Sequence, residues 1–360
     1  MISSDATSLY TASKDGSVIK WRRERDGRLR QARYFRKNVP ARGSATAAVA
    51  AADQDWGEGH KGEVLTLALS DDGRILASGG TDKVVGVWDT EREAWSRGLK
   101  GHRDTIASVA FRQGTAQLFS SSFDRTIKLF DLGTLSYIET LFGHQDSIQH
   151  VAAARAETAV SAGGRDRTVR FWKVPDESQL VFRGGSSSKA RSMLDTGVED
   201  DDDERHVGPL VEGSIEVVAM VDDSTFLSGG DSGALCLWST SKKKPVFTRH
   251  VAHGHEAAHV AEGELVRKAR WITALASVAY GNVFASGSWD GHVRLWRVDE
   301  RSFEPLATLD AQGVVNSLQL VYTGKALVVV AAVSKEPRLG RWMRLDDAKD
   351  CAIVWTIPCK

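Results

Sequence analysis

The sequence is short of the features that mark several large classes of protein. Its 360 residues include only three cysteines, Cys236, Cys351 and Cys359, which are too scattered for a disulfide framework or a paired metal-ligand motif. The start has no basic-then-apolar signal pattern, and apolar stretches such as 326–333 are far too short to span a bilayer. We therefore expect a protein of a reducing compartment, cytosolic or nuclear, without a membrane partner.

Net charge of one sign is also absent, because 47 Lys and Arg residues balance 47 Asp and Glu residues. This balance excludes a uniformly basic nucleic-acid binder and an acidic tail protein. It conceals two opposed segments, however. Residues 14–37 hold ten basic and three acidic side chains, whereas residues 195–204 hold seven acidic side chains and no basic one. Overall neutrality therefore does not exclude an RNA partner.

Tryptophan, by contrast, is plentiful, with 11 residues against five tyrosines, which indicates a repeated structural position. Three segments align without gaps. Each begins with Gly-His, at His60, His102 and His144, and each ends at an aromatic residue that recurs every 42 residues. That period is typical of WD repeats, in which each unit is a four-stranded blade of a β-propeller.

The spacing within each unit predicts a buried hydrogen-bond network. An Asp stands six residues before the aromatic residue, and a Ser or Thr commonly stands ten before it. In a blade, the His, the Asp, the hydroxyl and a Trp indole N–H can join in one network. We interpret these residues as structural rather than catalytic. The predicted members are His60, Ser78, Asp82 and Trp88, then His102, Ser120 and Asp124, then His144, Asp166 and Trp172.

Extending the count predicts one all-β domain, a seven-bladed WD-repeat propeller over residues 1–360. The predicted third-strand aromatic residues are Trp21, Trp88, Phe130, Trp172, Trp238, Trp296 and Trp342. The first recognisable strand, at 8–13, is a second strand, so we expect blade one to lack its innermost strand. Either the chain is truncated there, which we favour, or a C-terminal segment such as Cys351–Pro358 fills the gap.

Three stretches do not fit the repeat and are predicted to be insertions, at about 36–59, 184–209 and 252–270. Each follows an outermost strand and precedes an innermost strand, so all three should emerge on the face that carries the Gly-His loops. Loops on a rigid scaffold are where binding usually occurs. The Ser-rich and then acidic composition of the second stretch is also typical of a disordered surface loop.

Two short motif matches are declined. Gly57, Gly59 and Gly62 fit G-x-G-x-x-G, but a dinucleotide site needs a strand before the motif and a helix after it. His255, Glu256 and His259 fit H-E-x-x-H within an insertion. A short helix could place both histidines on one face, which would allow adventitious metal binding. A catalytic zinc site needs a buried helix and a third ligand. We predict no metal, no cofactor, no small-molecule substrate and no enzymatic activity.

Several cations are predicted to gather on the Gly-His face, because they lie on turns and loops that emerge there. Such a set suits phosphate, although WD turns are often polar and their arginines can form pairs within a blade. Composition alone weighs the two interpretations evenly. The cations are Lys14, Lys83, Arg103, Arg125, Arg165, Arg167 and Arg338.

At this point the chain resembles a known family, the WD-repeat proteins of the U3 small nucleolar ribonucleoprotein. The resemblance covers essentially the whole chain and includes residues outside the repeat pattern. It is carried by the run from Ser161 to Phe182, by Gly101-His-Arg-Asp-Thr, Phe111-Arg-Gln-Gly-Thr and Glu139-Thr-Leu-Phe-Gly-His-Gln-Asp146, and by Arg338-Leu-Gly-Arg-Trp-Met-Arg344. The acidic insertion and the lack of a basic N-terminal extension depart from the family.

The resemblance implies a non-catalytic subunit that binds U3 small nucleolar RNA at its box B/C element. It also implies that the protein is located in the nucleus, within the nucleolus. It implies a small kink-turn-binding protein and other box C/D ribonucleoprotein subunits as partners, and a role in early pre-ribosomal RNA processing for the small ribosomal subunit. Carried over residue by residue, Arg165 and Arg167 are the first candidates for RNA contacts, followed by Arg103, Arg125 and Gln145. The alternative is a generic WD-repeat scaffold that binds only proteins.

Overall fold

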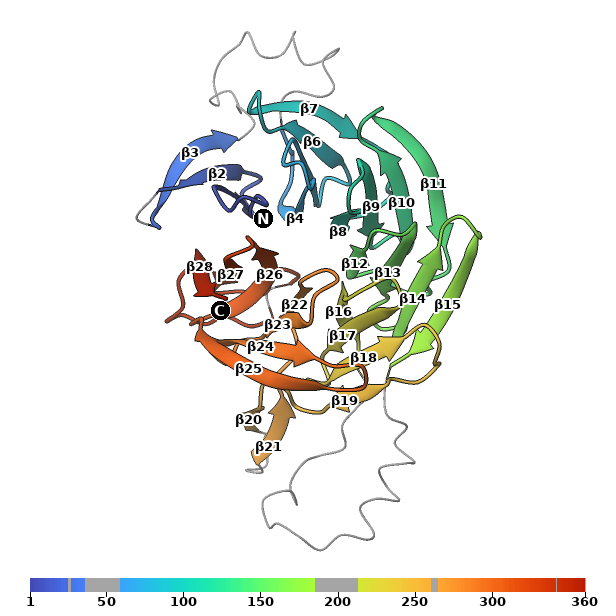
Figure 1. The fold of residues 1–360 in the computed structure, drawn as a ribbon, viewed down its shortest axis with the longest axis vertical. Coiled ribbons are helices and arrows are strands. Elements are labelled where there is room, and N and C mark those ends of the chain that lie inside the picture. Colours follow the sequence, from blue (N-terminus) through green and yellow to red (C-terminus); the bar gives the residue numbers. More distant parts are fainter. Residues whose placement is uncertain (25–26, 36–58, 185–212, 260–264, 341, 360) are drawn as a thin grey trace, which may run out of the picture.

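The structure is a computed structural model that describes residues 1–24, 27–35, 59–184, 213–259, 265–340 and 342–359. Within these ranges every regular element is a β-strand. Seven antiparallel sheets stand around a central axis, as Figure 1 shows, so the predicted seven-bladed propeller is confirmed. In the described part of the chain, no helix of the length and apolar character that a membrane span requires is found.

Blades two to six each contain four strands, which follow one another in chain order from the axis outward. Blade two comprises β4 (Val64–Leu69), β5 (Ile75–Gly80), β6 (Val85–Asp89) and β7 (Ala94–Leu99). Blade three comprises β8 (Ile106–Phe111), β9 (Gln117–Ser122), β10 (Thr126–Asp131) and β11 (Ser136–Phe142). Blade four comprises β12 (His150–Ala153), β13 (Thr158–Ala162), β14 (Thr168–Lys173) and β15 (Ser178–Arg183).

Blades five and six repeat this order. Blade five comprises β16 (Ile215–Met220), β17 (Thr225–Gly230), β18 (Leu235–Ser239) and β19 (Phe247–Arg249). Blade six comprises β22 (Ala274–Ser277), β23 (Val283–Gly287), β24 (His292–Val298) and β25 (Phe303–Asp310). Six of the seven predicted aromatic residues lie on third strands, Trp21 among them on β2 (Val18–Arg23) of blade one.

The hydrophobic core lies between neighbouring blades, because each sheet buries side chains on both faces. Val85 and Ala77 of blade two, for example, share a buried cluster with Ile106 and Val109 of blade three. The third-strand Trp296 is 1% exposed and stacks against Phe284 at a ring-centroid distance of 6.0 Å. Packing between blades therefore holds the turns of successive blades in a fixed arrangement on one face.

Blade one contains β1 (Ser8–Ala12), β2 and β3 (Leu29–Phe35), and it begins with a short segment rather than a full innermost strand. Ile2 forms a bridge to Leu9 of β1 on the axial side. The backbone N–H of Ile2 also donates to Gln319 Oε1 at 2.5 Å, and Gln319 Nε2 donates back to the Ile2 carbonyl at 3.1 Å. The segment around Ile2 therefore joins blade one to the inner strand of blade seven.

Blade seven contains β26 (Val314–Tyr322), β27 (Ala326–Ser334) and β28 (Cys351–Pro358). The interpretation that Cys351–Pro358 completes blade one is wrong, because β28 pairs with β27 and places Trp355 opposite Val329. The prediction that Trp342 is a third-strand residue is also wrong. Trp342 lies in the long connection between β27 and β28, and 48% of its surface is exposed.

The predicted insertions fall between the expected strands. Residues 36–59 and 184–209 lie almost wholly outside the described residues. The third, 252–270, contains the hairpin of β20 (His255–His259) and β21 (Leu265–Ala269), which projects from the ring beside blade six (Figure 1). The H-E-x-x-H match therefore forms a strand, not a helix. The described residues contain no group of three or more potential metal ligands.

Candidate functional site

The predicted His and Asp residues come together inside blades two, three and four, with the predicted Ser78 and Ser120 in the first two and with Ser161, which was not predicted, in blade four. The imidazole Nδ1 lies 2.8 Å from Asp82 in the His60 network, 2.9 Å from Asp124 in the His102 network and 2.7 Å from Asp166 in the His144 network. Nε2 of each histidine lies 2.6–2.8 Å from a serine hydroxyl: His60 from Ser78, His102 from Ser120 and His144 from Ser161.

Each network continues to the third strand where that strand carries a tryptophan. The indole Nε1 of Trp88 donates to Ser78 at 2.7 Å, and that of Trp172 donates to Ser161 at 2.8 Å. Ser161 stands eleven residues before its tryptophan because the turn between β13 and β14 holds one more residue than the turn between β5 and β6. Phe130 of blade three has no N–H, so Ser120 receives no indole hydrogen bond and the network ends at its hydroxyl.

A neutral imidazole satisfies this arrangement, because it donates from Nδ1 to the carboxylate and accepts at Nε2 from the hydroxyl. Burial lowers the pKa of His144, although the nearby Asp166 opposes this effect. The carboxylate also receives the backbone N–H that follows each histidine, from Lys61, Arg103 and Gln145 in turn. The network therefore fixes the loops that carry Arg103 and Gln145.

Blade six contains a network that the sequence analysis missed. His253 Nδ1 lies 2.9 Å from Asp290, and its Nε2 lies 2.8 Å from Ser286, which also accepts from the Trp296 indole at 2.8 Å. The hairpin β20–β21 follows His253, so the insertion separates this histidine from its own blade. Ala252 precedes it where the other units have glycine.

In six blades, the residue that follows the turn carboxylate, or the serine that replaces it in blade five, adopts a left-handed conformation. Glycine serves in three of them, at Gly16, Gly233 and Gly291, with φ between 69° and 83°. Blades two, three and four instead use Lys83 (φ 66°), Arg125 (φ 69°) and Arg167 (φ 57°). A side chain in this region costs about 1 kcal/mol or more relative to glycine. In three neighbouring blades, a strained backbone conformation thus places a basic side chain on one face of the propeller.

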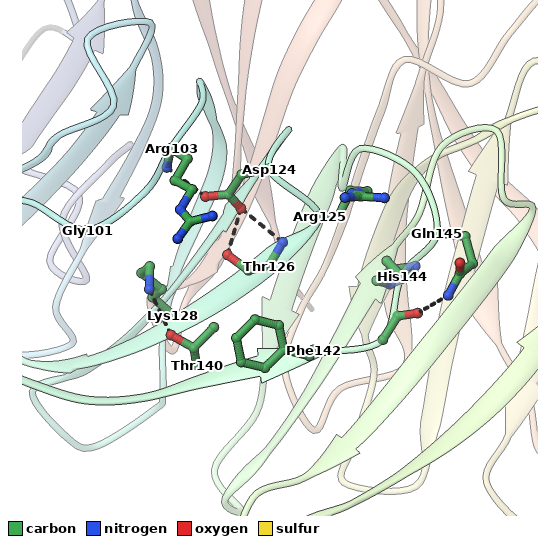
Figure 2. A pocket seen from close by; sticks show the side chains of 11 residues that line it. Gly101, Arg103, Asp124, Arg125, Thr126, Lys128, Thr140, Phe142, His144 and Gln145 are labelled. Atoms are coloured by element: carbon green, nitrogen blue, oxygen red, sulfur yellow. Dashed lines mark hydrogen bonds between the residues drawn. The ribbon is translucent and has the colours of Figure 1, made fainter.

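Three of the five predicted RNA-binding residues line one pocket of about 500 Å³ between blades three and four (Figure 2). These are Arg103, Arg125 and Gln145. Within the described ranges neither guanidinium group makes a hydrogen bond or an ion pair, whereas Gln145 Nε2 donates to the Gly143 carbonyl at 3.0 Å. The Lys83 ammonium donates to the Arg103 carbonyl at 2.9 Å and so supports the loop.

Arg165 and Arg167 belong to the adjoining turn of blade four and do not line this pocket. The Arg165 backbone N–H donates to Asp146 at 3.1 Å, and its charge acts on Glu216. Burial raises the pKa of that carboxyl, while the hydrogen bond from Ser214 and the charges of Arg338 and Arg165 oppose the rise.

Arg338 does not join the cations on the outer face, contrary to the prediction. It turns into the central channel, where Nη1 donates to the carbonyls of Leu65 (3.4 Å) and Ala107, and Nη2 donates to the carbonyl of Gln149 (3.4 Å). These residues lie on the axial side of blades two, three and four. Burial lowers the pKa of Arg338 to about 10, so it stays charged at neutral pH.

Comparison with known proteins places these features in context. The WD domain, G-beta repeat family matches residues 57–89, 95–131, 135–173 and 263–297. Ribosomal RNA-processing protein 9 of Saccharomyces cerevisiae is 36% identical over 93% of this chain and 64% of its own length. U3 small nucleolar RNA-interacting protein 2 of Homo sapiens is 36% identical over 98% of this chain and 65% of its own length. The chain thus spans just under two thirds of these relatives.

The solved structure of U3-55K superposes over the whole chain and 94% of its own residues, with a TM-score of 0.80 and 33% identity. The crystal structure of the RRP9 WD40 repeats gives the same TM-score and identity and is covered over 93% of its residues. The similarity extends to the sequence and the fold together.

Proposed function

This chain belongs to the WD-repeat family that includes yeast ribosomal RNA-processing protein 9 and human U3 small nucleolar RNA-interacting protein 2, and we propose that it is a non-catalytic assembly subunit that binds the U3 small nucleolar RNA. The family membership agrees with the prediction that the chain is not an enzyme. The proposed contact is the box B/C region of the RNA, and the proposed setting is early pre-ribosomal RNA processing in the nucleolus.

The observation that carries this proposal is the pair of unpartnered arginines on a rigid face. Arg103 and Arg125 come from two separate turns that the blade networks fix, and the described residues supply neither guanidinium with an acceptor. A guanidinium group can grip a phosphate through two hydrogen bonds or stack on an unpaired base. Lys83 and Arg167 add positive charge from the neighbouring turns of the same face.

Arg165 and Arg167 are proposed to contact the RNA beside the pocket residues. The resemblance of the sequence 163–167 to the family supports them, and so does their place on the turn next to the pocket. The small kink-turn-binding protein and the other box C/D subunits are proposed as partners on the same assembly. Nothing in this role requires a small-molecule substrate.

The proposal is tested by crosslinking in cells that express the tagged chain, followed by recovery and sequencing of the bound RNA. We expect the U3 RNA to be enriched over other small nucleolar RNAs, with crosslinks centred on box B/C. Recovery of proteins without any enriched U3 RNA would support the generic scaffold instead and would contradict the proposal.

A further inference from the structure

We propose that the pocket between blades three and four holds one unpaired nucleotide, with its base against Phe142 and its phosphate between Arg103 and Arg125. This inference rests on the proposed RNA-binding function and adds to it the kind of RNA element that the face selects. Phe142 and Lys128 line the pocket together with Arg103, Arg125 and Gln145 (Figure 2).

Phe142 is the first observation. It is the last residue of β11, and 70% of its surface is exposed, the largest fraction among the exposed large apolar side chains of the described residues. Burying such a side chain is worth about 1.5–3 kcal/mol, so an exposed phenyl ring at a pocket needs a reason. It takes no part in the blade networks and has no aromatic neighbour in contact within the described residues.

The ring is held on a rigid support. Phe142 lies opposite Thr126 in the register of β10 and β11, and His144, two residues later, is anchored to Asp166 at 2.7 Å. Between them lies Gly143, where the Arg170 guanidinium packs close to the backbone. A Cβ at this position would lie 2.4 Å from Arg170 Nη1, so a residue with a side chain would clash. The backbone that carries the ring is therefore already fixed, which reduces the conformational entropy lost when a ligand binds.

The charge of the pocket is the second observation. Three cations line it, and its acidic side chain, Asp124, is already engaged by His102, by the Arg103 backbone N–H and by Thr126. The Lys128 ammonium group donates to the Thr140 hydroxyl at 2.7 Å, and this hydrogen bond holds the ammonium group in the lining of the pocket. The guanidinium groups of Arg103 and Arg125 can therefore bind an anion from outside the chain, and phosphate is an anion that a guanidinium group binds through two hydrogen bonds.

The combination of a phenyl ring with cations favours single-stranded over double-stranded RNA. Bases inside a duplex keep their faces stacked on one another, whereas an unpaired base can lie flat on an aromatic side chain. Gln145 stands at the rim with its amide oxygen as an acceptor for a base edge. The volume of about 500 Å³ falls in the range of small-ligand pockets.

The test uses the full chain and an in vitro transcript of U3 RNA that contains box B/C. Phe142→Ala should weaken binding by about 5- to 150-fold, the range expected from losing one base–aromatic contact. Phe142→Tyr keeps a ring and should bind within about 3-fold of the unchanged chain, by the same reasoning. The matched control is Tyr322→Ala, since Tyr322 is 55% exposed at the end of β26 and does not line the pocket.

Salt dependence separates the two halves of the proposed site. Loss of stacking in Phe142→Ala should leave the slope of log affinity against log salt unchanged, because no phosphate contact is removed. Arg103→Ala with Arg125→Ala removes both contacts to the one bound phosphate and should reduce the slope by about 0.7, the value for one phosphate contact on a single strand. Thermal unfolding of each variant should match that of the unchanged chain, since all three side chains are at the surface.

The outcomes are distinct. If the unchanged chain does not bind U3 RNA, the proposed function fails and the nucleotide site fails with it. If the unchanged chain binds and Phe142→Ala binds equally well, only the nucleotide site is wrong. The same conclusion holds if Phe142→Tyr loses as much as Phe142→Ala, or if Phe142→Ala binds RNA normally but loses a protein partner.

Discussion

His253 Nδ1 lies 2.9 Å from Asp290 Oδ2, and the two residues are 37 positions apart in the chain. In blades two, three and four the equivalent pair is always 22 positions apart. The difference arises from the hairpin β20–β21, which is inserted after His253. Blade six thus keeps the buried network while presenting a longer loop on the same side as the other turns.

This network predicts a specific loss of stability. His253→Ala should lower the free energy of unfolding by about 3 kcal/mol, because it leaves the buried Asp290 carboxylate without its principal partner. Denaturant unfolding followed by tryptophan fluorescence measures this value. His255→Ala, on the hairpin itself, should change it by no more than about 0.5 kcal/mol. Equal losses in the two variants would show that His253 has no special structural role.

Arg338 should hold blade seven to the blades on the far side of the channel. Arg338→Leu removes the donors to the carbonyls of Ala107, Leu65 and Gln149, and we expect it to cost about 1–3 kcal/mol of unfolding free energy. The control is Arg344→Leu, an exposed residue of the same connection that pairs with Asp346 at 3.0 Å. It should cost less than about 1 kcal/mol. A larger effect at Arg344 than at Arg338 would contradict this account.

Trp342 and Trp238 should differ sharply in their contribution to stability. Trp238 is fully buried and donates to Ser228 at 2.8 Å, so Trp238→Ala should cost about 3–5 kcal/mol. Trp342 packs against Trp271 at a centroid distance of 4.5 Å but is 48% exposed, so Trp342→Ala should cost about 1 kcal/mol. Calorimetric or denaturant unfolding of both variants checks the order. A reversed order would place Trp342 in the fold as the sequence analysis first expected.

Stability should fall as the pH drops below about 6.5. Burial lowers the pKa values of His144 and His253, so the folded chain keeps both rings neutral where the unfolded chain takes up protons. Each such group contributes a slope of up to ~1.4 kcal/mol per pH unit between its folded and unfolded pKa values. Unfolding free energies at pH 7, 6 and 5 measure the slope. His253→Ala should have a shallower slope than the unchanged chain, and an identical slope would refute this assignment.

The regular part of the fold could be predicted from the sequence, because its spacing is set by local geometry. The distance from His60 to Trp88 follows from strand and turn lengths that repeat in blades three and four. The same regularity made Trp342 a false match, since the connection before β28 is much longer than an ordinary turn. It also hid His253, whose distance from Asp290 depends on the inserted hairpin.

The candidate site could be predicted only in part. The turn positions of Arg103 and Arg125 follow from the repeat, so their common face was predictable. Whether a side chain points outward or into the channel depends on contacts between blades that are distant in sequence, and Arg338 is the clearest case. Phe142 could not be predicted as a site residue, because the sequence does not distinguish an exposed apolar residue at the end of a strand from one in the core.

The measurement that tests the central claim most directly is the salt dependence of U3 RNA binding by the purified full chain. Arg103→Ala with Arg125→Ala is compared with Arg97→Ala and Arg183→Ala, a pair of exposed arginines on the outer strands β7 and β15. If the turn face binds RNA, the first pair weakens binding and reduces the salt slope by about 0.7, and the second pair changes neither. Unchanged affinity and slope in the first pair, or equal losses in both pairs, would contradict the account.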